Sequence, residues 1–229
     1  EGLQTLSDQV GDAKLLTYVG CNLRCLPSII TLRKMISEKI CGEPVRAHLE
    51  CGQWLPDRRP DADYRRSYSA QRRLGGGVAT DLIHEVDMAR WLFGEFDRSS
   101  VERGRFGGLD IDTDDVACFL FSRRDGPIVS VSLDYVARPP VRHYRVIGSL
   151  GTLAWDLPER TLKRSIPGNG WEIVPTGEAG FDMAGSYRTA MSAFLDCLRT
   201  GSASPHPLSD GIASLRLALA ALPSPLEVP

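Results

Sequence analysis

The sequence predicts an α+β fold, in which an open and mainly antiparallel sheet of about six strands carries helices on one face. Short runs with a period near two follow one another between about residues 99 and 175, separated by turn residues. Helical patterns precede and follow this stretch and do not alternate with its strands. That order is typical of helices packed on an antiparallel sheet.

The first elements are read from periodicity and helix-end signals. Residues 3–10 have the pattern of a helix end, and KLLTYVGCN (14–22) has that of a buried strand. A second helix is predicted between Pro27, near its start, and Gly42, just past its end. Residues 44–54 alternate as a strand.

A long polar segment, LPDRRPDADYRRSYSAQRR (55–73), follows without any apolar period. A loop of this length inside a compact domain is usually functional or disordered. Three glycines, Gly75 to Gly77, then lead into a helix that runs to about Glu95.

The remaining elements are strands and then two helices. The strands are SSVERGRF, DVACFLFS, PIVSVSLDYV, RHYRVIGS, GTLAWDL and, more weakly, TLKRS and WEIVP. One final helix is stopped by Gly201, and the other begins near Ser209 or Asp210. Because helices would cover one sheet face only, we expect a second copy on the other, hence a homodimer or larger homo-oligomer.

Composition excludes several classes of function. The chain has 229 residues and a net charge of −2, which does not favour a nucleic-acid or anionic-membrane partner. Its apolar runs are shorter than the ~18 residues that a membrane span requires, and its first residues do not resemble a signal peptide. Six scattered cysteines favour reduced thiols in a cytoplasmic protein.

The glycine-led helix carries the strongest candidate for catalysis. At helical spacing, Asp81, His84 and Asp87 fall in one stripe. A histidine in a first turn feels the positive helix end and stays neutral, so it could take a proton from a hydroxyl. The alternative is a first-turn carboxylate beside a structural histidine.

Candidate substrate contacts lie in the polar loop and near the first strand. Tyr64 and Tyr68 could hydrogen-bond a sugar or polyol, and Arg65 could pair with an acidic group, although tyrosines and arginines often fill interfaces or solvated surfaces. Asn22 and Arg24 follow a predicted strand, where open α/β sheets place ligands.

Other motifs are interpreted as structural or are missing. His48, His143 and His206 have no companions in sequence and are interpreted as structural. The Cys21-x-x-x-Cys25 spacing has no second pair to complete a metal site. No dinucleotide fingerprint and no P-loop occur, so the sequence assigns no cofactor-binding residues and no metal site.

Several stretches resemble the Gfo/Idh/MocA oxidoreductases, the glucose–fructose oxidoreductase and inositol dehydrogenase family. They are YVGCNLRCLPSIITLRKMI, CGEPVRAHLECGQWLPDRRPDADYRRSYSA, LGGGVATDLIHEVDMARWLFGE, DIDTDDVACFLF and VIGSLGTLAWDL. The resemblance runs from about residue 1 to 221, and the tail PSPLEVP lies outside it.

The resemblance implies an NAD- or NADP-dependent enzyme that transfers hydride at a hydroxyl or keto carbon of a sugar, polyol or nucleotide-activated sugar. By position, His84 matches the family's catalytic histidine. Many members place the partner aspartate four residues earlier, where this chain has Thr80, and Asp81 matches the spacing of a subgroup linked to nucleotide-activated sugars.

The resemblance also implies that the family's Glu-Lys-Pro motif and glycine-rich loop would precede residue 1. Residues 1–24 are then a remnant of the Rossmann domain, and residues 25–229 are the C-terminal domain that binds substrate and oligomerises. We therefore expect this chain alone to be inactive. The alternative is a non-catalytic module of the same family that binds a sugar or forms oligomers, and the cysteine spacing disfavours a zinc or redox protein.

Overall fold

The computed structural model describes residues 2–220, and eight strands in it form one open, mixed sheet in the order β2-β3-β4-β1-β5-β6-β7-β8. The strands are β1 Pro44–Gly52, β2 Arg98–Gly104, β3 Val116–Ser122, β4 Ile128–Asp134, β5 Val141–Gly148, β6 Gly151–Asp156, β7 Thr161–Ser165 and β8 Trp171–Ile173. The α+β class is confirmed. The sheet exceeds six strands because β1 and the weak runs β7 and β8 all join it.

Strand β1 lies at the centre of the sheet, and this placement decides where the following loop begins. It pairs in parallel with β4, with Gly52 opposite Asp134, and antiparallel with β5; all other neighbours are antiparallel. The carboxyl ends of β1 and β4 therefore lie at the same edge of the sheet. The residues after Gly52 and those after Asp134 leave the sheet side by side.

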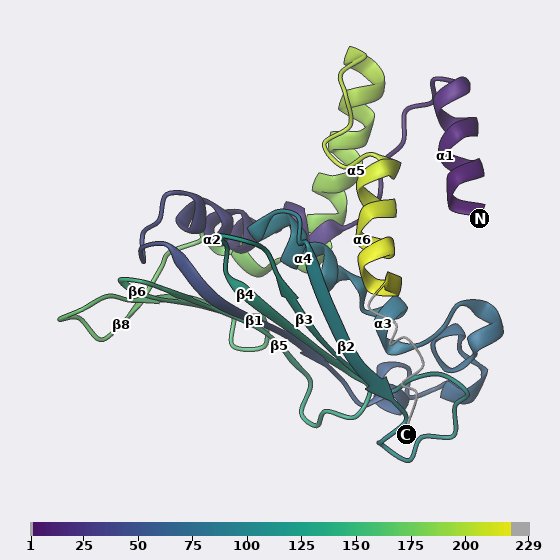
Figure 1. Cartoon of the computed structure of the whole chain (residues 1–229), viewed down its shortest axis with the longest axis horizontal. Helices are drawn as coiled ribbons and strands as arrows, with labels where there is room; N and C mark the ends of the chain where they lie inside the picture. Colours follow the sequence, from purple (N-terminus) through teal and green to yellow (C-terminus); the bar gives the residue numbers. More distant parts are fainter. Residues whose placement is uncertain (1, 221–229) are drawn as a thin grey trace.

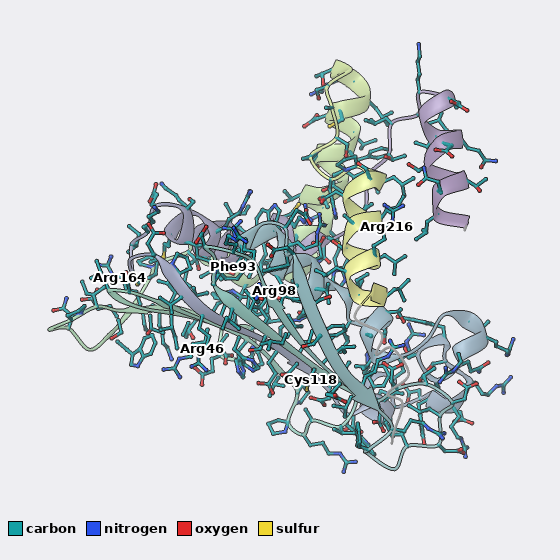
Figure 2. All side chains as sticks on the ribbon, viewed as in Figure 1. Arg46, Phe93, Arg98, Cys118, Arg164 and Arg216 are labelled. Carbon is teal, nitrogen blue, oxygen red and sulfur yellow. The ribbon has the colours of Figure 1, made fainter. Side chains whose placement is uncertain are left out.

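The helices cover one face of the sheet (Figure 1). They are α1 Gly2–Asp12, α2 Pro27–Ser37, α3 Val78–Asp81, α4 Ile83–Phe93, α5 Met183–Thr200 and α6 Leu208–Ala220. Helix α1 stands away from the sheet and meets α6, where Arg216 donates to Gln4 at 3.2 Å. Figure 2 places Phe93, at the end of α4, on the helix side, and Arg46 on the opposite side.

The hydrophobic core lies between the sheet and α2, α3 and α4. Alternate residues of β1, such as Ala47 and Leu49, are buried there, as the period-two pattern requires. Trp155 and Tyr144 are fully buried, with their ring centroids 4.7 Å apart. Burial of each such side chain contributes about 1.5–3 kcal/mol.

Two predicted elements differ in the structure. Residues 14–22 are not a buried strand: this segment is extended, and Leu15 is 61% exposed. No other described strand pairs with it, and its backbone bond to the rest of the fold runs from Val19 N to His206 O at 2.8 Å. Helix α2 ends at Ser37, before the turn that contains Lys39 at φ 55°.

The short helical turns of residues 55–74 replace the predicted featureless loop. Four 3₁₀ turns follow one another: Leu55–Arg58, Tyr64–Arg66, Tyr68–Ala70 and Arg72–Leu74. Among the described residues, no helix is long and apolar enough to cross a membrane. The tail PSPLEVP lies outside the described residues.

Candidate active site

The Asp81 carboxylate is the centre of a hydrogen-bond network. It accepts from the guanidinium of Arg58, from the hydroxyl of Tyr68, from Ser69 Oγ at 2.9 Å and from the hydroxyl of Tyr135 at 2.9 Å. Its side chain is 1% exposed. These donors come from the loop after β1 and from the end of β4, which the parallel pairing of the two strands brings together.

The network fixes the protonation state of its members. Burial opposes ionisation of Asp81, but the hydrogen bond from Tyr68 and the charge of Arg58 outweigh it, and the pKa of Asp81 is lowered. Burial and the Asp81 carboxylate raise the pKa values of Tyr68 and Tyr135. Near pH 7, Asp81 is therefore an anion and both tyrosines are protonated donors.

His84 lies in the first turn of α4, and burial lowers its pKa below the ordinary value of 6.5. Its Nδ1 atom is buried and has no hydrogen-bond partner among the described residues. A neutral imidazole with an uncommitted nitrogen is suited to accept a proton. His84 therefore has an unpaired acceptor atom, which the surrounding protein encloses.

The expected single helix through Asp81 and His84 is broken at Leu82. Asp81 ends the short helix α3, Leu82 adopts φ −99° and ψ 31°, and α4 begins at Ile83. No hydrogen bond joins Asp81 to His84 in the described chain. Asp81 instead holds tyrosine, serine and arginine side chains in place.

A cavity of about 540 Å³ lies next to this network. Tyr64 and Tyr68 both line it, so the structure brings these two predicted contacts together, whereas Arg65 lies outside the lining and pairs with Asp63 at 2.8 Å. Arg66 lines it instead. The full lining is Leu55, Arg58, Arg59, Ala62, Asp63, Tyr64, Arg66, Ser67, Tyr68 and Ser69.

A second cavity, of about 330 Å³, shares Arg58 with the first. Tyr135 and Arg142 also line it, and Arg142 pairs with the fully buried Glu85 at 2.8 Å. Neither cavity is lined by Asp81 or His84 themselves. The Asp81 carboxylate thus contacts the two cavities only through the lining residues that it binds, Arg58 among them.

Asn22 and Arg24 lie apart from both cavities and bind protein groups. Asn22 is buried and donates to Ser186 Oγ at 2.8 Å. Arg24 binds Asp87 at 2.6 and 2.8 Å and Asp210 at 2.7 Å. In this structure the two side chains tie the first residues to α4, α5 and α6.

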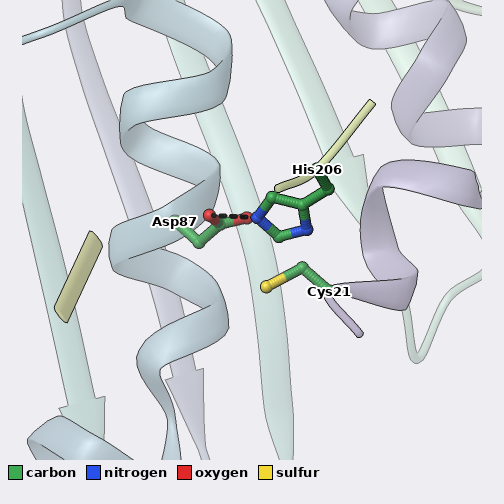
Figure 3. Close-up of side chains that lie close together, drawn as sticks. All are labelled: Cys21, Asp87 and His206. Atoms are coloured by element: carbon green, nitrogen blue, oxygen red, sulfur yellow. Dashed lines mark ion pairs between the residues drawn. The ribbon is translucent and has the colours of Figure 1, made fainter. Parts of the chain in front are cut away.

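Asp87 lies in a buried cluster with Cys21 and His206 (Figure 3). His206 Nε2 lies 3.6 Å from the Asp87 carboxylate. Burial raises the pKa of the Cys21 thiol, and Arg24 already neutralises Asp87, so neither side chain is a ready metal ligand. The cluster has the character of a buried ion-pair network.

Sequence reasoning did not single out Arg58, Ser69 or Tyr135. Arg58 and Ser69 lie in the polar loop, but no periodicity distinguishes them from its other polar residues. Tyr135 follows an apolar strand, and a hydroxyl at a strand end was the one available signal. Pairing with Asp81 depends on the β1–β4 register, which spans more than 80 residues.

The glycine entry is packed against the protein's own backbone. A Cβ atom at Gly76 would lie 2.0 Å from the carbonyl oxygen of Tyr68, and one at Gly77 would lie 2.7 Å from Asp114 Oδ1. Oxygen atoms of carbonyl and carboxylate groups repel a phosphate. The glycines therefore hold the Tyr68 turn in place and do not form a dinucleotide cradle.

We expect Gly76→Ala to destabilise the fold by about 1–3 kcal/mol, because the added methyl group displaces the Tyr68 and Ser69 backbone. Thermal unfolding measures the loss, and limited proteolysis shows whether residues 55–73 loosen. Gly170→Ala is the matched control, since a Cβ there meets nothing within 4 Å. Equal melting temperatures for the two variants would contradict the close packing.

Comparisons with known proteins extend this geometry. The model of the GFO/IDH/MocA C-terminal domain matches residues 29–154. No curated protein matches the sequence at a significant level. Levoglucosan dehydrogenase, solved with NADH and levoglucosan, is similar to the chain with a TM-score of 0.81 and 19% identity, over 96% of this chain and 67% of that one.

Two further structures are similar. One is an oxidoreductase from Agrobacterium radiobacter in complex with NAD+, L-tartaric acid and magnesium, with a TM-score of 0.79, 19% identity, and 96% and 65% of the two chains covered. The other is UDP-N-acetylglucosamine 3-dehydrogenase from Acidithiobacillus ferrooxidans, with a TM-score of 0.73 and 19% identity, over 96% of this chain and 64% of that one. The chain thus spans 64–67% of the length of these three structures, and at such identities the likeness is one of fold.

Proposed function

We propose, from the premise that the chain belongs to the GFO/IDH/MocA oxidoreductase family, that it forms the substrate-binding part of an enzyme that oxidises or reduces a hydroxyl or keto carbon of a sugar, polyol or nucleotide-activated sugar. In this proposal residues 1–24 end a Rossmann domain and residues 25–229 form the C-terminal domain. The protein acts in the cytoplasm as a homodimer whose open sheet face carries exposed apolar side chains such as Leu120 and Ile128.

One observation carries the proposal. A neutral histidine, His84, lies three residues after a buried carboxylate, Asp81, that holds Tyr68, Ser69 and Arg58 in the wall of a cavity. A 540 Å³ cavity is within the range of small-molecule sites. Hydroxyl and guanidinium groups at fixed positions suit a ligand that is itself rich in hydroxyls.

The residues have distinct proposed roles. His84 accepts the proton of the reacting hydroxyl during oxidation and returns it during reduction. Asp81 is a positioning residue, because it orients Tyr68 and Arg58 towards the cavity. Tyr64 and Arg66 contact more distant parts of the substrate.

A nicotinamide cofactor, NAD or NADP, supplies or takes up hydride when bound. The described residues do not fit its diphosphate, because the glycines before α3 face carbonyl and carboxylate oxygens. The described residues of this chain therefore act on the substrate hydroxyl, and the Rossmann domain would hold the cofactor.

Calorimetric titration of this 229-residue chain tests the proposal. We expect no saturable binding of NADH or NADPH, because the described residues lack a phosphate cradle. We do expect saturable binding of a polyol, sugar or nucleotide-activated sugar. Tyr68→Phe removes the hydroxyl bound to Asp81 and should weaken binding of the sugar at least about tenfold. Cofactor binding by the folded chain would contradict the assignment of the cofactor to another domain.

The alternative, a non-catalytic sugar-binding or oligomerisation module, is supported by the missing cradle alone. The two proposals predict different turnover when the chain is joined to its nicotinamide-binding domain. There the oxidoreductase turns over the sugar that this chain binds, whereas the module binds the sugar without turnover.

A further inference from the structure

Three side chains with metal-binding chemistry meet on the open face of the sheet, although one of them is far from the other two in sequence. His48 and Glu50 are alternate residues of β1, and His143 of β5 is the register partner of Glu50. The intervening residues Ala47 and Leu49 point into the core. The cluster of His48, Glu50 and His143 therefore lies on the face opposite the helices, away from Asp81 and His84.

The three ligand atoms are close to the spacing that a metal ion requires. Glu50 Oε2 lies 3.3 Å from His48 Nε2 and 3.1 Å from His143 Nε2, and all three atoms lie within 4.8 Å of one another. In a tetrahedral zinc site with bonds of about 2.1 Å, ligand atoms lie about 3.4 Å apart. The distances from the carboxylate oxygen to the two imidazole nitrogens are thus close to the distance between ligand atoms in a zinc site.

Ser130 and Glu50 hold the His48 ring from its two nitrogen atoms. Ser130 Oγ lies 2.9 Å from His48 Nδ1, and Glu50 Oε2 lies 3.3 Å from His48 Nε2. In the tautomer that carries its proton on Nδ1, the Nε2 atom has a lone pair that a metal ion can bind. That atom is on the side of the ring that faces Glu50.

The same Ser130 contact is the outer-shell bond that metal-binding histidines make. A ligating imidazole almost always passes its second N–H to a carboxylate, carbonyl or hydroxyl, which orients the ring. Here Ser130 on β4 orients His48 on the neighbouring strand β1. The ring is thus held with Nε2 towards Glu50.

We propose that His48, Glu50 and His143 bind one divalent transition-metal ion of the zinc type, with a fourth position left for water. The side chains are 35%, 29% and 37% exposed in the single chain, so an ion can reach them before a second copy covers this sheet face. Imidazole ligands select zinc-type ions over Mg²⁺ and Ca²⁺, which prefer oxygen. Pairing of β1 with β5 thus brings together ligands that the sequence alone does not show to be neighbours.

Equilibrium dialysis of the chain against Zn²⁺, with metal content measured by mass spectrometry, tests the proposal. We expect one ion per chain, and Co²⁺ as a second probe should give the visible absorption of a four- or five-coordinate site. Glu50→Gln and His143→Gln should each weaken binding about 100-fold or more. Ser130→Ala keeps all three ligands and should weaken it about 10-fold.

Two matched variants separate this site from other ligands. Cys118→Ser removes an exposed thiol on the same sheet face, and His84→Asn removes a histidine on the helix side. Both should bind Zn²⁺ like the unaltered chain. Because all three ligands are partly exposed, their variants should keep the far-UV circular dichroism of the metal-free protein.

The proposal is overturned by any of three results from folded protein. These are no saturable binding of Zn²⁺ or Co²⁺, unchanged binding in Glu50→Gln and His143→Gln, or loss of binding in Cys118→Ser. The first would mean that the three side chains only hydrogen-bond to one another. The last would assign the metal to the thiol.

Discussion

His84→Asn is expected to lower kcat by about 10²–10⁴-fold in the enzyme that carries its nicotinamide-binding domain. Asparagine keeps a polar side chain at the start of α4 but cannot take a proton from the reacting hydroxyl. Because the proton moves only in the transition state, kcat should fall while KM for the sugar stays close to its original value. Steady-state kinetics at saturating cofactor measure both parameters.

The pH profile gives a second readout of the same role. Burial lowers the pKa of His84, so the neutral form persists below the ordinary histidine value of 6.5. Oxidation by the unaltered enzyme should therefore hold its rate through neutral pH and decline only at more acidic pH. In His84→Asn this acidic limb should disappear, and added imidazole should restore part of the rate.

Structural damage is the competing explanation, and the melting temperature separates the two. His84 contributes no hydrogen bond through its buried Nδ1, so its replacement should change the unfolding free energy by about 1 kcal/mol or less. A variant that melts normally and turns over within about threefold of the original would show that His84 is not the base.

The predictability of this fold follows the range of the interactions involved. Period-two patterns depend on adjacent residues, and every strand of the sheet was visible in them, even the short β8. The prediction of a strand at residues 14–22 was wrong, because an apolar run becomes a strand only when another strand pairs with it. Such a partner cannot be read from the run itself.

The site was predictable only in part for the same reason. Tyr68 and Asp81 are 13 residues apart and were both singled out, and they do meet. Tyr135 and Arg58 reach Asp81 through the parallel pairing of β1 with β4, a register that no local motif encodes. His48 and His143 were interpreted as solitary, and antiparallel pairing of β1 with β5 brings both to Glu50.

Asp87→Asn is expected to cost about 3 kcal/mol of folding free energy, the largest stability effect among these predictions. The Asp87 side chain is 0% exposed and that of Arg24 is 9% exposed, so the substitution leaves a nearly buried guanidinium with Asp210 as its remaining carboxylate partner. Only one oxygen acceptor then remains for Ser214 and Arg24, and His206 loses one of its two neighbouring carboxylates. Urea unfolding of both proteins near pH 7 measures the difference.

The difference should depend on pH in a defined direction. Burial alone would raise the pKa of Asp87, but the nearby His206 side chain and the hydrogen bonds and charge of Arg24 lower it well below its usual range. A carboxyl group with a lowered folded-state pKa stabilises the fold above its unfolded pKa of about 3.9 and loses this contribution as pH falls towards the folded value. The difference in unfolding free energy between the unaltered chain and Asp87→Asn should therefore begin to shrink as the pH falls below about 4.

Asp196→Asn provides the control, because it breaks an ion pair with Arg199 in which both side chains are more than half exposed. Such a pair contributes about 0.2–1 kcal/mol, so this variant should unfold close to the unaltered chain at every pH. If Asp87→Asn behaved like Asp196→Asn, the buried pair would be replaceable by a neutral amide. Arg24 would then have no structural role that depends on Asp87, and this result would favour the substrate contact predicted for Arg24.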